Sequence, residues 1–270
     1  MNLREYRLLA ATVLALSATT AHPAEDTIAT ALYARVADGY KRERLKDGSF
    51  KPEYYALSNG GRLDGTSSDN SVERVTYPEV AEIAQRLLAR QNYHYARSAD
   101  QAQLLLVLNW GNTRTYNREN YEEAIKKGNV DIENQLRDQI NEDNARILGY
   151  MDELADSNDI RRLAGTGDRY KDLVADVEEA RYYIMISAYD FRELARQNRR
   201  KLLWQVRVSV RTAGNRFDEG LVAMLTSASK YFGQDSGRLV RTEISKGSVE
   251  MGEIKYLGEA KEPAQKGDKK

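Results

Sequence analysis

The sequence predicts an α+β protein, with one mixed or antiparallel sheet, helices packed on one face and a long helical insertion. Three segments lead to this prediction. Residues 104–108 are five consecutive aliphatic residues, which is typical of an interior strand. Residues 202–211 alternate apolar and polar side chains, the period of a half-buried strand. Residues 118–180 are polar with single aliphatic residues at helical spacing, which indicates helices inserted between strands of one sheet.

The first third of the chain is expected to supply a helix, a strand, a loop and a second helix. Residues 27–45 carry apolar side chains close to helical spacing, so we predict a first helix there. Residues 54–57 predict a short strand, and the small residues of 58–71 predict a loop. Thr76 and Glu79 match a capping box, in which each side chain bonds the backbone of the other residue, and this pattern predicts the start of a helix.

The helical insertion contains one long helix, or two, ending near Ser157. A break is expected at residues 165–167, where two glycines flank a threonine, and a further helix at 170–179. Because the aliphatic stripe is narrow, these helices bury only one side. This pattern is compatible with a hairpin that projects from the body.

The last third has the clearest pattern. We predict, in order, a strand at 182–189, a charged connection at 192–201, a strand at 202–211 that includes Trp204, a helix capped near Asn215 that ends at Gly233, and one or two short strands within 238–258.

The amino-terminal residues match a secretory signal peptide. Arg4 and Arg7 precede an apolar run at 8–18 and small residues up to Ala24, and cleavage after Ala21 or Ala24 fits the pattern. The predicted organisation is a signal peptide at 1–24, the first part of the α+β domain at 25–116, the helical insertion at 117–180, the second part at 181–258 and a disordered tail at 259–270.

Composition limits the expected location of the protein and the expected class of partner. The chain has 41 basic and 41 acidic residues, and loss of residues 1–24 leaves 39 and 40. Without a clustered basic surface, nucleic acid is not an expected partner. The chain has no cysteine, so it can form neither a disulfide nor a lipid-anchoring cysteine site. Since no other window has about 20 apolar residues, no integral membrane segment is expected after signal removal. The predicted location is the periplasm or the exterior.

Four segments resemble a group of uncharacterised secreted bacterial proteins, and together they touch most of the mature chain. They are YYALSNGG, LLLVLNWGNT, AYDF and KLLWQVRVSVRTAGNRFDEGLVAMLTSASKYFGQDSG. More remotely, the order of a helix, a buried strand, paired strands with a Trp and a closing helix resembles envelope domains that share a fold with the amino-terminal domain of TolB. Those domains are commonly lipoproteins, whereas this chain has no cysteine. The resemblance implies an envelope setting and a fold, and it brings no catalytic residues.

No catalytic residue, metal ligand or cofactor is predicted. His94 is the only histidine after the predicted signal peptide. One histidine and no cysteine argue against a histidine-dependent nucleophilic site and against a zinc site. Residues 227–230 match S-x-x-K and residues 68–70 match S-D-N, but their order is reversed relative to serine penicillin-binding enzymes and no K-T-G follows. Residues 64–70 lack the acid spacing of a calcium loop.

The aromatic residues at the strand ends leave two interpretations open. Trp110 and Trp204 are expected to close the core, because each buries a large ring. The alternative is a surface groove whose aromatic faces hold a sugar or a peptide. Its candidate residues are Asn109, Trp110, Tyr116, Tyr189, Asp190, Gly60 and Arg62.

We therefore expect an exported, non-enzymatic, envelope-associated protein of unknown ligand. It would act by binding an envelope protein, or by self-assembly through the helical insertion. The alternative is a carboxylate-dependent hydrolase acting on cell-wall or polysaccharide material, which would need two acids from distant segments to converge in a cleft beside Trp110.

Overall fold

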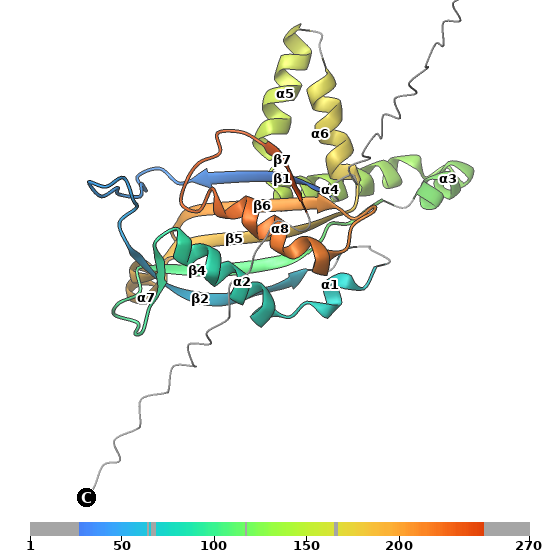
Figure 1. The fold of residues 1–270 in the computed structure, drawn as a ribbon. Helices are drawn as coiled ribbons and strands as arrows, with labels where there is room; N and C mark the ends of the chain where they lie inside the picture. Colours follow the sequence, from blue (N-terminus) through green and yellow to red (C-terminus); the bar gives the residue numbers. More distant parts are fainter. Residues whose placement is uncertain (1–26, 64, 66–68, 117, 165–166, 246–270) are drawn as a thin grey trace, which may run out of the picture.

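A seven-stranded sheet forms the centre of the molecule (Figure 1). The computed structural model describes residues 27–245, apart from 64, 66–68, 117 and 165–166. The predicted signal peptide (1–24), the predicted tail (259–270) and most of the region predicted to hold the last short strands lie outside the described residues. The strands are β1 (Thr27–Val36), β2 (Glu53–Leu63), β3 (Tyr93–Tyr95), β4 (Leu104–Asn112), β5 (Arg181–Asp190), β6 (Leu202–Arg211) and β7 (Val240–Ser245).

The strand order is β3-β2-β4-β5-β6-β1-β7. β2 pairs in parallel with β3 and with β4, and the other neighbouring strands pair antiparallel. The prediction of an α+β fold with a mixed sheet is confirmed. The aliphatic run of β4 and the alternating β6 both pair with β5, so they belong to one sheet, as the sequence predicts.

The helix predicted for residues 27–45 is wrong, because residues 27–36 form β1. Ile28, Thr30 and Leu32 alternate along the strand and are buried on one face of the sheet, while Ala31 is buried on the other. β1 lies between β6 and β7. Burial on both faces removes the simple alternation that marks a half-buried strand, and the remaining apolar spacing resembles that of a helix.

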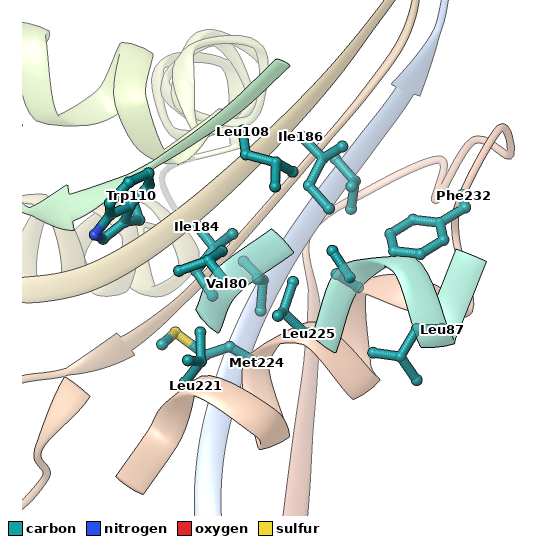
Figure 2. Close-up of a cluster of buried hydrophobic side chains, with 14 of the residues drawn as sticks. Val80, Leu87, Leu108, Trp110, Ile184, Ile186, Leu221, Met224, Leu225 and Phe232 are labelled. Atoms are coloured by element: carbon teal, nitrogen blue, oxygen red, sulfur yellow. The ribbon is translucent and has the colours of Figure 1, made fainter. Parts of the chain in front are cut away.

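Three helices cover one face of the sheet and enclose the main core. They are α1 (Ser71–Arg74), α2 (Tyr77–Arg90) and α8 (Phe217–Ser229). The predicted capping box is present at the start of α2, where the backbone amide of Thr76 donates to Glu79 Oε2 at 2.6 Å. Figure 2 shows side chains of α2 and α8 meeting those of β4 and β5; the labelled residues are Val80, Leu87, Leu108, Trp110, Ile184, Ile186, Leu221, Met224, Leu225 and Phe232.

Both tryptophans close this core, as predicted. Trp110 is 4% exposed and stacks on Tyr77 with ring centroids 6.3 Å apart. Trp204 is 1% exposed and stacks on Phe232 at 5.9 Å. Neither indole N–H has a hydrogen-bond partner among the residues that the structure describes. Their contribution therefore comes from burial and ring packing.

The helical insertion covers part of the opposite face. It consists of α3 (Arg118–Lys127), α4 (Val130–Leu148), α5 (Met151–Ala164) and α6 (Asp168–Glu178). Leu148, Tyr150 and Leu173 form a second, smaller core with Tyr183 of β5 and Ala31 of β1. In Figure 1 the α5–α6 hairpin projects past β1 and β7 at one edge of the sheet.

The remaining differences from the predictions are local. β2 continues through Leu63, so the first residues of the predicted loop at 58–71 belong to a strand. A short helix, α7 (Phe191–Gln197), occupies part of the predicted charged connection at 192–201. The N-cap residue of α8 is Arg216, one position after the predicted Asn215. Across the described residues, no helix combines the length and the apolar composition that crossing a bilayer requires.

Candidate functional site

A buried carboxylate on α6 joins the helical insertion to the sheet. Asp176 is 3% exposed and contacts three arginines, each from a different strand. Arg181 Nη1 lies 3.2 Å from Asp176 Oδ1, Arg211 Nη2 lies 3.6 Å from the same oxygen, and Arg241 Nη2 contacts Asp176 Oδ2. Arg181 is also buried, and its Nε donates to Ser209 Oγ at 3.0 Å. These charge-assisted contacts fix the position of α6 over the sheet.

A cavity of about 410 Å³ lies beside this carboxylate, between α6 and the beginning of β7. Its lining combines three arginines, one aspartate and three aliphatic residues. The lining residues are Arg169, Asp172, Leu173, Arg238, Leu239, Val240 and Arg241. This volume falls within the usual range for pockets that bind small ligands.

The groups behind the cavity wall fix two of its three arginines. Arg169 contacts Glu153 Oε2, and Glu153 Oε1 accepts from the backbone amide of Leu239 at 2.8 Å. Arg241 is held by Asp176. Arg238, by contrast, makes no ion pair with any residue in the described part of the chain. One guanidinium group of the cavity is therefore not neutralised by a direct contact.

The cavity and its ionic neighbours carry one more positive than negative charge. The cations are Arg169, Arg181, Arg211, Arg238 and Arg241, and the anions are Glu153, Asp172, Asp176 and Glu179. Burial lowers the pKa of Arg241, but the hydrogen bond that Arg241 donates to Asp176 and the negative charge of Asp176 outweigh burial and leave that pKa raised. Arg241 thus stays cationic. Guanidinium groups bind carboxylates and phosphates through paired, charge-assisted hydrogen bonds.

Four of the candidate residues from the sequence lie on the neighbouring strands β2 and β4. Asn109 Nδ2 donates to the carbonyl oxygen of Gly60 at 2.6 Å, where a register shift in β2 forms a bulge. Arg62 lies opposite Trp110 in the pairing of these strands. Trp110 is buried against Tyr77, whereas its neighbour Asn109 points to the other face of the sheet. The indole and the amide therefore do not share one surface.

The other three candidates lie elsewhere. Tyr189 pairs with Leu105, at the end of β4 opposite to Trp110. Asp190 caps α7, because its Oδ1 accepts from the backbone amide of Glu193 at 3.0 Å. Tyr116 follows β4, and its hydroxyl bonds Glu133 of α4. The structure does not bring these three residues into one groove with Trp110.

Tyr116 lines a second, smaller cavity of about 270 Å³ in the insertion, with Tyr121, Arg137, Asn141 and Glu178. The rings of Tyr116 and Tyr121 meet edge to face at 6.4 Å. Burial and the bond to Glu133 raise the pKa of Tyr116 to about 12, so the phenol is neutral at physiological pH. This second cavity is lined by one arginine and one glutamate, whose charges balance. It is therefore a weaker site for a charged ligand than the arginine-lined cavity.

The sequence interpretation missed the arginine-lined cavity. Arg169, Arg238 and Arg241 form no motif, and the cavity exists only because α6 packs next to the start of β7. Each arginine, viewed alone, resembles an ordinary solvated charge. In the described part of the chain, no group of three or more histidine, aspartate or glutamate side chains is arranged to hold a metal ion.

No protein-family model and no curated protein sequence matches the chain. Among solved structures, a PDZ domain protein from Parabacteroides distasonis ATCC 8503 aligns with 82% of this chain and 39% of its own chain. The two share 10% sequence identity, with a TM-score of 0.38. This chain thus spans well under half the length of that protein.

Proposed function

We propose that the protein is an exported, non-enzymatic, envelope-associated binding protein, and that the arginine-lined cavity holds an anionic group of its ligand. The observation that carries this proposal is Arg238, a cavity-lining guanidinium group with no ion-pair partner among the described residues. A carboxylate or phosphate would supply that partner. The apolar side chains of Leu173 and Leu239 would pack against a hydrocarbon part of the ligand.

The fixed arginines support the same conclusion. Arg169 and Arg241 are each held by a carboxylate of the insertion, so their positions are set before a ligand arrives. Preorganised groups lose little conformational entropy on binding, which favours affinity. Asp172 also lines the cavity, and its negative charge would repel an anion there. The site should therefore bind a singly charged group more readily than a multiply charged one.

The hydrolase alternative needs two carboxyl groups that face each other across a cleft. The buried carboxylates of the described residues have other contacts: Glu153 lies against Arg169, and Asp176 against Arg181 and Arg241. Glu53, which is half-buried, accepts from Tyr40 and Arg42. This arrangement supports binding over hydrolysis.

Calorimetric titration of the mature protein with N-acetyl-leucine and with inorganic phosphate tests the cavity. We expect N-acetyl-leucine to bind, and the R238A variant to bind it about tenfold or more weakly, because one charge-assisted contact is lost. R196A removes an exposed arginine of α7 and serves as the matched control. Equal affinities of R238A and R196A for both probes would contradict the proposal.

Export is tested separately. We expect the protein in a periplasmic or culture-medium fraction to begin after Ala21 or Ala24, as determined by amino-terminal sequencing. Recovery of the intact amino terminus in the cytoplasm alone would remove the envelope part of the proposal without affecting the cavity.

A further inference from the structure

The edge strand β7 adjoins the arginine-lined cavity. Among the described residues β7 pairs only with β1, on one side. The backbone groups on its other side therefore have no strand partner within the described part of the chain, and such an edge can accept an additional strand. Val240 and Arg241 belong both to β7 and to the cavity wall. Within the described residues, this unpaired edge and the cavity thus form one continuous surface.

We propose that the ligand is an extended peptide that adds to β7 as an antiparallel strand and places its terminal carboxylate in the arginine-lined cavity. This inference rests on the proposed function, which assigns the cavity to an anionic group. It adds the class of ligand, the direction in which the ligand runs and the edge of the sheet that it extends. Strand addition of this kind takes affinity from main-chain hydrogen bonds and specificity from alternate side chains.

The direction follows from the position of the cavity. β7 runs from Val240 to Ser245, and the cavity lies at its beginning, beside residues 238–241. A strand that pairs antiparallel to β7 runs the opposite way and arrives at the cavity with its carboxyl end. A parallel strand would bring an amino terminus to the same place, where the excess positive charge would repel an ammonium group. The charge of the cavity therefore selects the antiparallel direction.

The side chains of β7 define what the peptide should contain. Val240 and Ile244 share one face, where both pack against the main core as partly buried residues. Arg241 and Glu243 lie on the other face and are exposed. Directly opposite side chains on paired strands interact, and pairs of opposite charge stabilise the pairing. A suitable peptide therefore has apolar residues on the first face and a lysine or arginine opposite Glu243.

The projecting hairpin bounds this surface on one side. α6 contacts the start of β7 through Asp176 and Arg241, and α5 does so through Glu153 and the backbone of Leu239. Figure 1 shows both helices extending past β1 and β7 at this edge.

The test uses the mature protein and the probe peptide acetyl-Val-Lys-Thr-Thr-Val-Leu with a free carboxyl terminus. We expect it to bind at least tenfold more tightly than N-acetyl-leucine, which shares only its last residue. Amidation of the carboxyl terminus should weaken binding about tenfold or more, as should backbone N-methylation at alternate amides. R238A should lower affinity for the free acid while leaving affinity for the amide nearly unchanged. E243K, with R196A as the control, should lower affinity for the lysine-containing peptide.

Hydrogen exchange supplies an independent readout, since bound peptide should protect backbone amides of β7. The two proposals fail in different ways. If N-acetyl-leucine binds through Arg238 but the peptide gains nothing over it and tolerates N-methylation, strand addition is overturned and the anion site stands. If neither probe binds, both proposals fall. A wild-type dimer whose β7 amides lose protection on dilution would assign this edge to a second copy and overturn the peptide ligand.

Discussion

Asn109 of β4 covers Gly60 of β2 so closely that the glycine has no space for a side chain. Asn109 Nδ2 donates to the carbonyl oxygen of Gly60 at 2.6 Å, and a Cβ atom built on Gly60 would lie 2.5 Å from that nitrogen. The contact occurs at the bulge where the register of β2 shifts. A glycine and an amide at this point let β2 continue through a segment whose composition resembles a loop.

The first prediction concerns this pair. G60A should lower the free energy of unfolding by about 1–3 kcal/mol, because the new methyl group displaces Asn109 and breaks its hydrogen bond. N109A alone should cost about 0.5–1.5 kcal/mol. Since both changes remove the same contact, the double variant should lose less than the two single losses combined, as measured by urea unfolding. Strict additivity would show that the two residues are not coupled.

The second prediction concerns the capping box of α2. The hydrogen bond from the Thr76 backbone amide lowers the pKa of Glu79 below its usual value. An acid with a lowered folded-state pKa stabilises the protein above its unfolded-state pKa, and this contribution disappears as pH falls through the folded-state value. E79Q should therefore cost about 0.5 kcal/mol at pH 7, and this cost should shrink as pH falls through the folded-state pKa of Glu79. Urea unfolding over a series of pH values below 7 measures this change, and a penalty independent of pH would contradict it.

The third prediction concerns Asp176. D176N should lower the free energy of unfolding by about 3–5 kcal/mol, because Arg181 is buried and would lose its counter-charge. D138N is the matched control: Asp138 is exposed and pairs with Arg137 on the surface of α4. It should change stability by less than about 0.5 kcal/mol. Similar losses for the two variants would show that the cluster does not anchor the insertion.

The fourth prediction compares two glycines with nearly the same backbone conformation. Gly149 ends α4 with φ +81°, and a Cβ atom there would lie 2.9 Å from the ring of Tyr33. Gly39 has φ +83° and open space around it. G39A should cost about 1 kcal/mol from backbone strain alone. G149A should cost about 1–2 kcal/mol more, because the packing of α4 on the sheet must also shift. Thermal or urea unfolding gives both values, and equal losses would exclude the packing contribution.

Strands and helices that bury mainly one face were predictable from the sequence. β6 alternates because one face lies on the main core and the other is partly open, and α2 begins at a capping box that is entirely local. β1 was not predictable, because its residues are buried by partners from the far end of the chain. Its short apolar run gives no local signal that separates a strand from a helix.

The candidate site also has one part that the sequence could predict and one part that it could not. The sequence predicts that Trp110 and Trp204 pack in the core, since large rings at strand ends gain most from burial. It could not locate the arginine-lined cavity, whose residues come from α6 and from the segment that enters β7. Charges on separate elements become a site only through tertiary packing. For the same reason, the sequence could not show that β5 places Tyr189 at the end of β4 opposite to Trp110.

The position of β1 constrains how the chain acquires its structure. Among the described residues β1 is the first strand, and it lies between β6 and β7, the last two, so both of its neighbours are synthesised after most of the described sequence. A nascent chain that stops before β6 lacks both strands that pair with β1 in the described sheet, and closing the sheet brings the two ends of the described sequence together. Such high contact order slows folding, so the sheet is completed only after synthesis of the chain is nearly finished.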